Sequence, residues 1–212
     1  VRLKFCWSAL CFFRLHGCAD GGGEPGGGVA AFRTIQKTMS RIILETQRLQ
    51  LREMTLADLP SLAAVLQDER VMYAYEGAFS DAETALWMQK QLRRYREHGF
   101  GLWAVVLKDT REMIGQCGIT LQEYKGKQVS EIGYLLAHGH WHRGYAAEAA
   151  VACREYGFNT LNFNALYSII RDTNVPSQQV ALRNGMTLVD TIVKFYRGVR
   201  MPHWVYRVQK GR

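Results

Sequence analysis

The chain between residues 129 and 171 is predicted to form a strand, a crossover helix and a second strand. Strand-like residues over 129–137 precede a helical pattern over 145–158, and residues 165–171 again have the pattern of a strand. Two strands of one sheet that are joined through a helix run parallel to each other. The other strand-like segments favour antiparallel pairing, so the sequence predicts an α+β (mixed α/β) fold with one parallel pair.

The remaining segments complete the order β-α-α-β-β-β-α-β-α-β-β, a sheet of about seven strands flanked by about four helices. Capping boxes at Thr55–Asp58 and Ser80–Glu83 open the first two helices. In the first strand, alternation predicts Leu49 and Leu51 inside and Gln50 outside. The expected strands are 42–52, 102–108, 113–123, 129–137, 165–171, 187–194 and 203–208; the expected helices are 59–66, 81–98, 145–158 and 176–184.

Residues 1–38 differ in composition from the rest of the chain. Gly21–Gly28 has the composition of a flexible linker, and Arg2 and Lys4 before an apolar stretch resemble a signal peptide. Alternatively, because globular patterning begins at Met39, residues 1–38 are a non-native or disordered extension read in frame from an upstream start. We expect residues 39–212 to form a single domain that folds without them.

Composition restricts the classes of partner. The net charge of +8 comes from scattered Lys and Arg residues, which favours a basic surface for anionic ligands over nucleic-acid binding. The five cysteines lack metal-site spacing, and Cys117 and Cys153 lie in core-like patterns, which predicts reduced thiols and a cytoplasmic protein. No apolar run reaches the roughly 18 residues of a membrane helix.

The start of the helix at residue 145 has the features of a phosphate site. The first N–H groups of a helix lack internal partners and attract anions, and Gly144 lets a ligand approach the backbone. Small residues on one side predict close packing on the sheet: Ala146, Ala149, Ala150, Cys153 and Gly157. Glu148 and Glu155 are expected to face water.

The preceding histidines raise the alternative of a metal site. On a continuous strand His138, His140 and His142 would share one face and could bind zinc. Gly139 and Gly144 indicate that the strand has already ended, and no further ligand lies nearby in the sequence. We therefore predict no metal site, with the backbone of this segment carrying its function.

Seven segments of the chain, taken together and in order, carry a family resemblance: Glu45–Arg52, Trp103–Lys108, Ile114–Gly118, Glu131–Leu135, Trp141–Ala149, Asn174–Ser177 and Asn184–Met186. They resemble the GNAT acetyltransferase superfamily, and within it the ribosomal-protein N-terminal (alanine/serine) acetyltransferases. The resemblance covers about residues 40–209, and Gly144 and Ala146 fit the superfamily pattern Q/R-x-x-G-x-G/A, in which Trp141 replaces the first residue. The resemblance implies the GNAT fold, in which the sheet splays at its parallel pair.

The resemblance also implies acetyl-CoA as the co-substrate and acetyl transfer to a primary amine. The pyrophosphate is expected on His142, Arg143, Gly144, Tyr145, Ala146 and Ala147, and the pantetheine arm beside Leu135, Leu136 and Ala137. Asn174 is expected to bond this arm, to cap the following helix, or to do both.

Catalytic roles are implied for two residues. Glu131 is the candidate general base, or else a solvent-facing strand residue; Ser177 is the candidate proton donor to the thiolate, or else a helix cap. A backbone N–H near Leu135 would stabilise the carbonyl oxygen, and Tyr134 faces either the site or the core.

The resemblance implies that the acceptor binds at Tyr73, Tyr75, Glu76 and Phe79, although the aromatic residues could instead pack over the core. It also favours a protein N-terminus, such as that of a ribosomal protein, as the acceptor. An α-amine with a pKa of about 7.7–8.0 needs little help to lose its proton. A small-molecule amine and a catalytically silent acyl-CoA-binding protein are the alternatives. The protein is expected to be a monomer or a homodimer.

Overall fold

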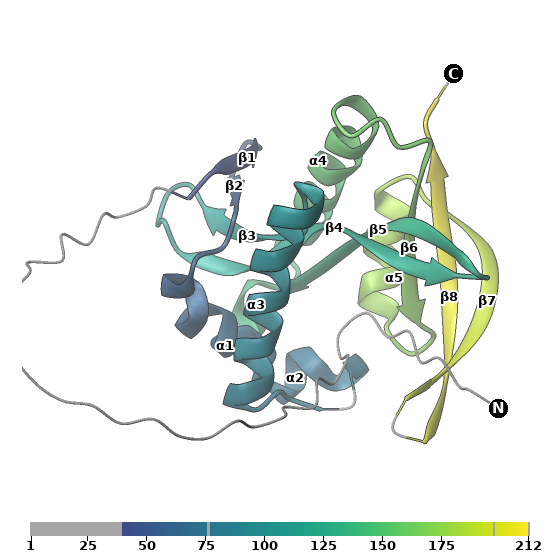
Figure 1. Ribbon diagram of the computed structural model, residues 1–212, viewed down its shortest axis with the longest axis horizontal. Coiled ribbons are helices and arrows are strands. Elements are labelled where there is room, and N and C mark those ends of the chain that lie inside the picture. Colours follow the sequence, from purple (N-terminus) through teal and green to yellow (C-terminus); the bar gives the residue numbers. More distant parts are fainter. Residues whose placement is uncertain (1–39, 76, 197, 212) are drawn as a thin grey trace, which may run out of the picture. The chain divides into compact units, whose positions relative to one another are not determined.

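A computed structural model describes residues 40–75, 77–196 and 198–211 of the chain. The predicted extension 1–38 and Glu76 lie outside these residues. The described residues form five α-helices and one eight-stranded mixed sheet (Figure 1). The strands are β1 (Ile42–Glu45), β2 (Leu49–Arg52), β3 (Leu102–Leu107), β4 (Met113–Tyr124), β5 (Lys127–Leu136), β6 (Ala165–Arg171), β7 (Thr187–Tyr196) and β8 (Val199–Gln209). The helices are α1 (Leu59–Leu66), α2 (Glu69–Met72), α3 (Asp81–His98), α4 (Tyr145–Asn159) and α5 (Val175–Arg183).

The sheet order is β1-β2-β3-β4-β5-β6-β8-β7, and β5–β6 is the parallel pair among otherwise antiparallel neighbours. This confirms the mixed fold and the position of the parallel pair. The Ser80–Glu83 capping box is present, and α3 ends at Gly99, whose φ of 75° is left-handed. Local sequence signals therefore determine both ends of α3.

Three elements differ in detail from those expected. The segment 42–52 is a hairpin of two strands, which gives eight strands where about seven were expected. The short α2 adds a fifth helix. Strand β8 begins at Val199, before the expected residue 203, and runs through Pro202. Its pairing with β6 ends at His203, so Pro202 needs no N–H for that neighbour.

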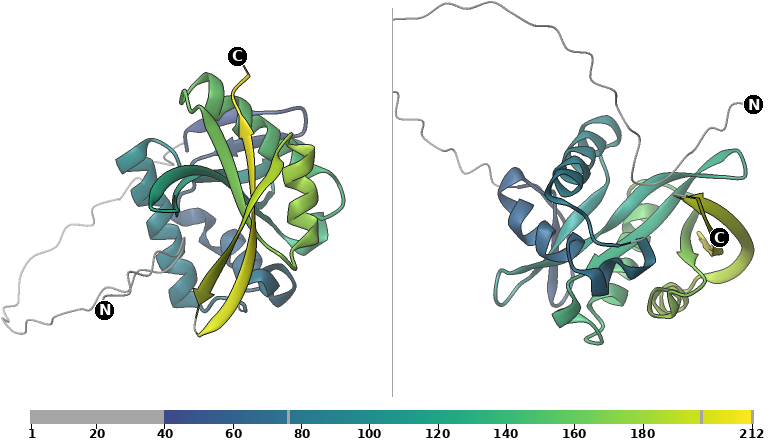
Figure 2. Two further views of the ribbon diagram at one scale, coloured as in Figure 1. Left: turned by 90° about the vertical axis from the view of Figure 1, so that its right-hand side faces the viewer. Right: turned by 90° about the horizontal axis from the view of Figure 1, so that it is seen from below.

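Helices α3 and α4 cover opposite faces of the sheet. The right view of Figure 2 shows α3 on one face and α5 on the other, and α5 packs beside α4. On β4, Gln116 accepts a hydrogen bond from Trp87 Nε1 of α3 at 3.0 Å. The next residue, Cys117, points to the other face, with its Sγ 3.6 Å from Cys153 Sγ of α4. Both cysteines are buried and free, as the sequence predicted.

The small side of α4 packs directly on the sheet. Ala149, Ala150 and Cys153 are fully buried, and a Cβ on Gly157 would lie 2.9 Å from Leu166 Cδ1. This close packing confirms the role predicted for the small residues, and it fixes the start of α4 beside the end of β5.

No helix of the described residues is long and apolar enough to span a membrane.

Candidate active site

The parallel strands β5 and β6 meet at one point and then separate. Their register pairs Glu131 with Tyr167. Just beyond, side chains make the contacts between the strands: Ser168 Oγ donates to Ile132 O at 2.9 Å, and Ile169 N donates to Glu131 Oε1 at 3.0 Å. The separation thus begins at two hydrogen bonds that β6 donates to β5.

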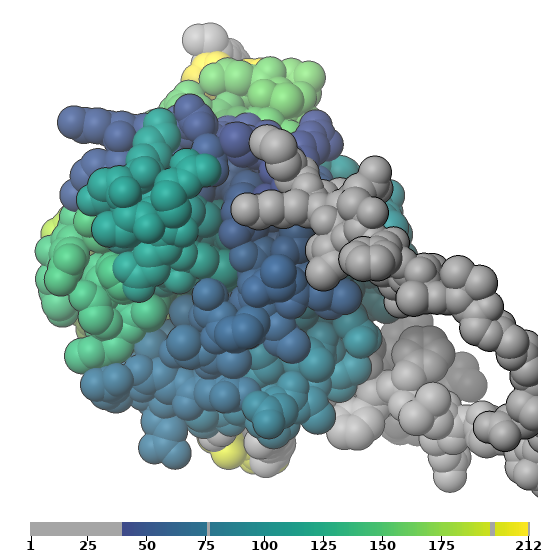
Figure 3. All heavy atoms as spheres, turned by 90° about the vertical axis from the view of Figure 1, so that its left-hand side faces the viewer, coloured from purple at the N-terminus to yellow at the C-terminus, as the bar shows by residue number. Residues whose placement is uncertain are grey.

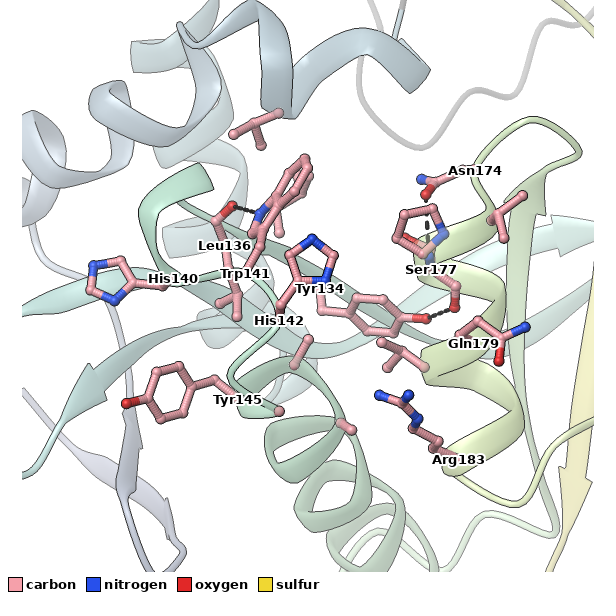
Figure 4. Close-up of a pocket in the computed structure, with 18 of the residues that line it drawn as sticks. Tyr134, Leu136, His140, Trp141, His142, Tyr145, Asn174, Ser177, Gln179 and Arg183 are labelled. Carbon is pink, nitrogen blue, oxygen red and sulfur yellow. Dashed lines mark hydrogen bonds between the residues drawn. The ribbon is translucent and has the colours of Figure 1, made fainter.

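A cavity of about 370 Å³ opens past this point (Figure 4). The end of β5 forms one wall, α5 with the residues before it forms the other, and the first turn of α4 lies between them. The lining residues are Val71, Tyr73, Tyr134, Leu135, Leu136, His140, Trp141, His142, Gly144, Tyr145, Ala146, Ala147, Asn174, Val175, Pro176, Ser177, Gln179, Val180 and Arg183.

The start of α4 presents free backbone donors. Gly144 is the N-cap residue with φ 82°, no side chain among the described residues caps the helix, and the first helical bond runs from Glu148 N to Gly144 O at 3.0 Å. His142 is also left-handed, with φ 59°, which is uncommon for a residue other than glycine. The N–H groups of Tyr145, Ala146 and Ala147 therefore have no helical partner.

The three histidines diverge. The His138 ring packs on Trp141 with centroids 4.9 Å apart, His140 Nε2 lies 3.3 Å from Glu112 Oε1, and His142 lines the cavity. Trp141 itself donates its Nε1–H to Leu136 O at 2.8 Å (Figure 4). Within the described residues, no group of three His, Cys, Asp or Glu side chains could hold a metal ion.

Asn174 caps α5 and lines the cavity. Its Oδ1 accepts hydrogen bonds from Ser177 N at 3.2 Å and from Tyr73 Oη at 2.9 Å. Because Asn174 is the cap, the side chain of Ser177 is not needed for capping. Tyr73, predicted to bind the acceptor, thus connects the α2 region to the cavity wall.

Tyr134 crosses from β5 toward α5 and donates its hydroxyl proton to Ser177 O at 2.6 Å (Figure 4). Burial raises the pKa of Tyr134 well above its ordinary value. The sequence left its orientation open; its cross-strand partner Cys117 places it on the α4 face.

Glu131 lies on the opposite face of the sheet, because its cross-strand partner is Thr120, three residues beyond Cys117. Burial raises the pKa of Glu131 despite the hydrogen bond from Ile169 N. Burial, and to a lesser extent the charge of Glu131, raise the pKa of Tyr75.

Some predicted residues lie away from the cavity. Glu131, Ala137, Arg143, Tyr75 and Phe79 are not among its lining residues. Ala137 donates its N–H to Ile114 O at 2.9 Å. Phe79 is 9% exposed and packs edge-to-face on Trp87, which is the core packing that the sequence left open.

Residue Arg183 was missed by the sequence reasoning. It reaches into the cavity from the last turn of α5 (Figure 4). A basic residue near a helix C-terminus is ordinarily explained by the helix dipole, so nothing in the local pattern pointed to the site.

A family model described as Acetyltransferase (GNAT) domain matches residues 48–187. The chain is an acetyltransferase of the GNAT family. The family uses acetyl-CoA as its acetyl donor.

Relatives support this assignment. The uncharacterized protein YkkB of Bacillus subtilis (strain 168) is 38% identical over 157 residues, which cover 74% of this chain and 91% of that protein. The structure of an acetyltransferase from Agrobacterium tumefaciens str. C58 is 35% identical, with a TM-score of 0.67 over 79% of this chain and 94% of that one. RimL, a ribosomal L7/L12 alpha-N-protein acetyltransferase solved with coenzyme A, has the same fold at 20% identity, with a TM-score of 0.67 over 80% of this chain and 98% of RimL.

Proposed function

We propose that this GNAT acetyltransferase transfers the acetyl group of acetyl-CoA to a primary amine, and that the amine is the N-terminus of a peptide or protein. The observation that carries the proposal is the cavity at the separation of β5 and β6, with the uncapped start of α4 at its floor. A diphosphate fits this floor because helix N–H groups and the helix dipole favour anions.

Residues of both walls would hold acetyl-CoA, which when bound supplies the thioester. The N–H groups of Tyr145 to Ala147 would bind the pyrophosphate, with His142 and Arg183 lining the same cavity. The recorded pairing of β5 with β6 is at Glu131, so the edge of β5 at Leu135 and Leu136 can pair with an extended pantetheine arm. Because Leu136 O already accepts the Nε1–H of Trp141, we assign the contact from Leu136 to its N–H. Asn174 Oδ1 is occupied by the fold, which leaves its amide Nδ2 for this arm.

The acceptor amine would approach from the α3 face. Glu131 lies on that face, and a carboxyl whose pKa is raised by burial is a better proton acceptor near neutral pH. On the α4 face, Ser177 and the Tyr134 hydroxyl lie on the cavity wall. We assign the protonation of the leaving thiolate to Ser177, because the Tyr134 proton is engaged with Ser177 O.

An N-terminal amine is favoured over a lysine for a physical reason. About a tenth of α-amines are neutral at pH 7, against fewer than one lysine in a thousand, so the single half-buried carboxylate of Glu131 suffices as the base. The name of RimL, a protein N-terminal acetyltransferase of the same fold, agrees with this choice. The cytoplasmic location and the monomer or homodimer state stay predictions from the sequence.

Thiol release from acetyl-CoA with a panel of amines tests the proposal. Peptides beginning with Ser, Ala or Thr should be acetylated faster than the same peptides with a blocked N-terminus and one internal lysine. Preference for a small-molecule amine would refute the acceptor class, and acetyl-CoA binding without thiol release for any amine would indicate a silent binding protein.

Ser177→Ala tests the proton donor. We expect kcat to fall at least about tenfold with an unchanged KM for acetyl-CoA, as for the loss of general-acid help. An unchanged kcat would contradict the assignment.

A further inference from the structure

Two segments far apart in the sequence meet beside the candidate pyrophosphate site. Glu148, in the first turn of α4, accepts three hydrogen bonds from the turn between β1 and β2. Its Oε1 receives Thr46 Oγ1 at 2.6 Å and Arg48 N at 3.0 Å, and its Oε2 receives Arg48 Nε at 2.7 Å. The side chain of Glu148 is 19% exposed, so the expectation that it faces water was wrong. We call Thr46, Arg48 and Glu148 the latch.

Glu148 is ionised in this arrangement. Burial acts to raise its pKa, but the hydrogen bonds from Thr46 and Arg48 outweigh burial and hold the pKa below its ordinary value. The latch therefore joins a carboxylate to a guanidinium through two-point contact, because Arg48 Nε and Nη2 both lie against Glu148 Oε2, at 2.7 and 2.6 Å. Such a contact fixes direction as well as distance.

Arg48 also contacts the turn that leads into α4. Its Nη1 donates to Arg143 O at 3.0 Å, and its guanidinium lies over the Tyr145 ring, 4.5 Å from the ring centre. Arg48 Nη2 would be 3.4 Å from a Cβ at Gly144. One side chain thus contacts the residues on both sides of Gly144 in the candidate phosphate turn, Arg143 and Tyr145.

We propose that the latch holds residues 142–147 in the conformation that binds the diphosphate of acetyl-CoA, and that Arg48 and Glu148 are positioning residues. The turn needs such support because His142 and Gly144 are both in the left-handed region, which is costly for His142. The β1–β2 hairpin supplies it from the edge of the sheet (purple in Figure 3). The inference rests on the proposed function of this turn.

The charges allow positioning to be separated from simple attraction. A carboxylate beside a diphosphate repels it and a cation attracts it. If charge alone mattered, Glu148→Gln would tighten acetyl-CoA binding and Arg48→Lys would preserve it. The latch requires the opposite, because Gln replaces one acceptor oxygen by a donor and Lys cannot form the two-point contact.

The test is calorimetric binding of acetyl-CoA to the full chain, with Lys108→Met as the matched control. Lys108 carries the same charge as Arg48 and contacts the same hairpin, with its Nζ 2.7 Å from Thr46 O and 3.5 Å from Glu45 Oε2. These contacts are to the hairpin and not to α4. We expect the Kd to rise at least about tenfold for Glu148→Gln and for Arg48→Lys, as for a lost hydrogen bond between charged groups, and less than about twofold for Lys108→Met.

Hydrogen–deuterium exchange without ligand gives a second readout. Both latch variants should exchange faster at 46–48 and 142–147, with the rest of the described domain unchanged. Equal or tighter binding by Glu148→Gln, unchanged binding by Arg48→Lys, or faster exchange throughout the domain would each refute the role of the latch. None of these results would refute the proposed function. Failure of the unmodified chain to bind acetyl-CoA would refute the proposed function, and the inference with it.

Discussion

Replacing Gly144 with alanine tests whether the backbone before α4 binds the diphosphate. Gly144 has φ 82° and ψ −2°, and a Cβ there would lie 3.4 Å from the flexible end of Arg48. The steric contact is therefore minor, and the left-handed conformation sets the cost at about 1–2 kcal/mol. If the turn relaxes to avoid this cost, the N–H groups of Tyr145 to Ala147 lose their alignment, and binding weakens by about 5- to 30-fold.

The assay is the Kd of acetyl-CoA at constant salt, together with the melting temperature. Gly139→Ala is the matched control, because it lies five residues earlier, has no positive φ and has no atom within 4 Å of its Cβ position. We expect the Kd of Gly139→Ala to stay within about twofold of the unmodified chain. Equal Kd and equal stability for Gly144→Ala and Gly139→Ala would refute the reasoning.

Two further predictions concern stability. His203 is 6% exposed, and burial lowers its pKa from 6.5 to about 4, so the folded state resists protonation of this residue. The free energy of unfolding should therefore fall by up to about 3 kcal/mol as the pH drops from 6.5 to 4. His203→Gln should remove this part of the fall in melting temperature. Gly157→Ala would bring a Cβ to 2.9 Å from Leu166 Cδ1 and 3.1 Å from Ile119 Cδ1. Overpacking of about 1–3 kcal/mol exceeds the roughly 0.5–1 kcal/mol gained by an alanine in a helix, so the melting temperature should drop by several degrees; a rise would show slack between α4 and the sheet.

The sequence predicted those helix ends and packing faces that depend on residues close together in the chain. The cap at Ser80, the left-handed Gly99 and the small face of α4 each depend on neighbours in the sequence or on side-chain size. The split of 42–52 into a hairpin could not be predicted in this way. Its turn is held by Glu148, a hundred residues further along, whose spacing suggested a water-facing residue.

Burial of polar residues was the second limit. Gln50 has the pattern of an outward residue but is 6% exposed, because it donates to Glu45 Oε1 of the neighbouring strand at 2.9 Å. Gln91 on α3 is fully buried, and its Oε1 accepts Leu102 N at 3.2 Å. The hydrophobic periodicity of the sequence assigns such polar residues to the solvent-facing side, because it does not show the partners that they find on other elements.

Glu131 has two possible roles at the strand separation, and the structure shows how to distinguish them. Its Oε1 accepts the N–H of Ile169, which would otherwise be left unpaired where the strands part. Glutamine keeps an oxygen for this bond but cannot take a proton, whereas alanine loses both functions. A residue that only fixes the separation should keep nearly full kcat as Glu131→Gln and lose stability as Glu131→Ala. If Glu131 is a general base, kcat should instead fall at least about tenfold with either substitution.

The dependence of stability on pH gives a second test of Glu131. Burial raises its pKa, so the folded state favours the neutral form, and the charge costs stability as the pH rises past that pKa. The Glu131→Gln variant should therefore melt at a higher temperature than the unmodified chain at pH 8 but not at pH 4. A Gln variant that is both fully active and no more stable at pH 8 would contradict the base and the buried charge together.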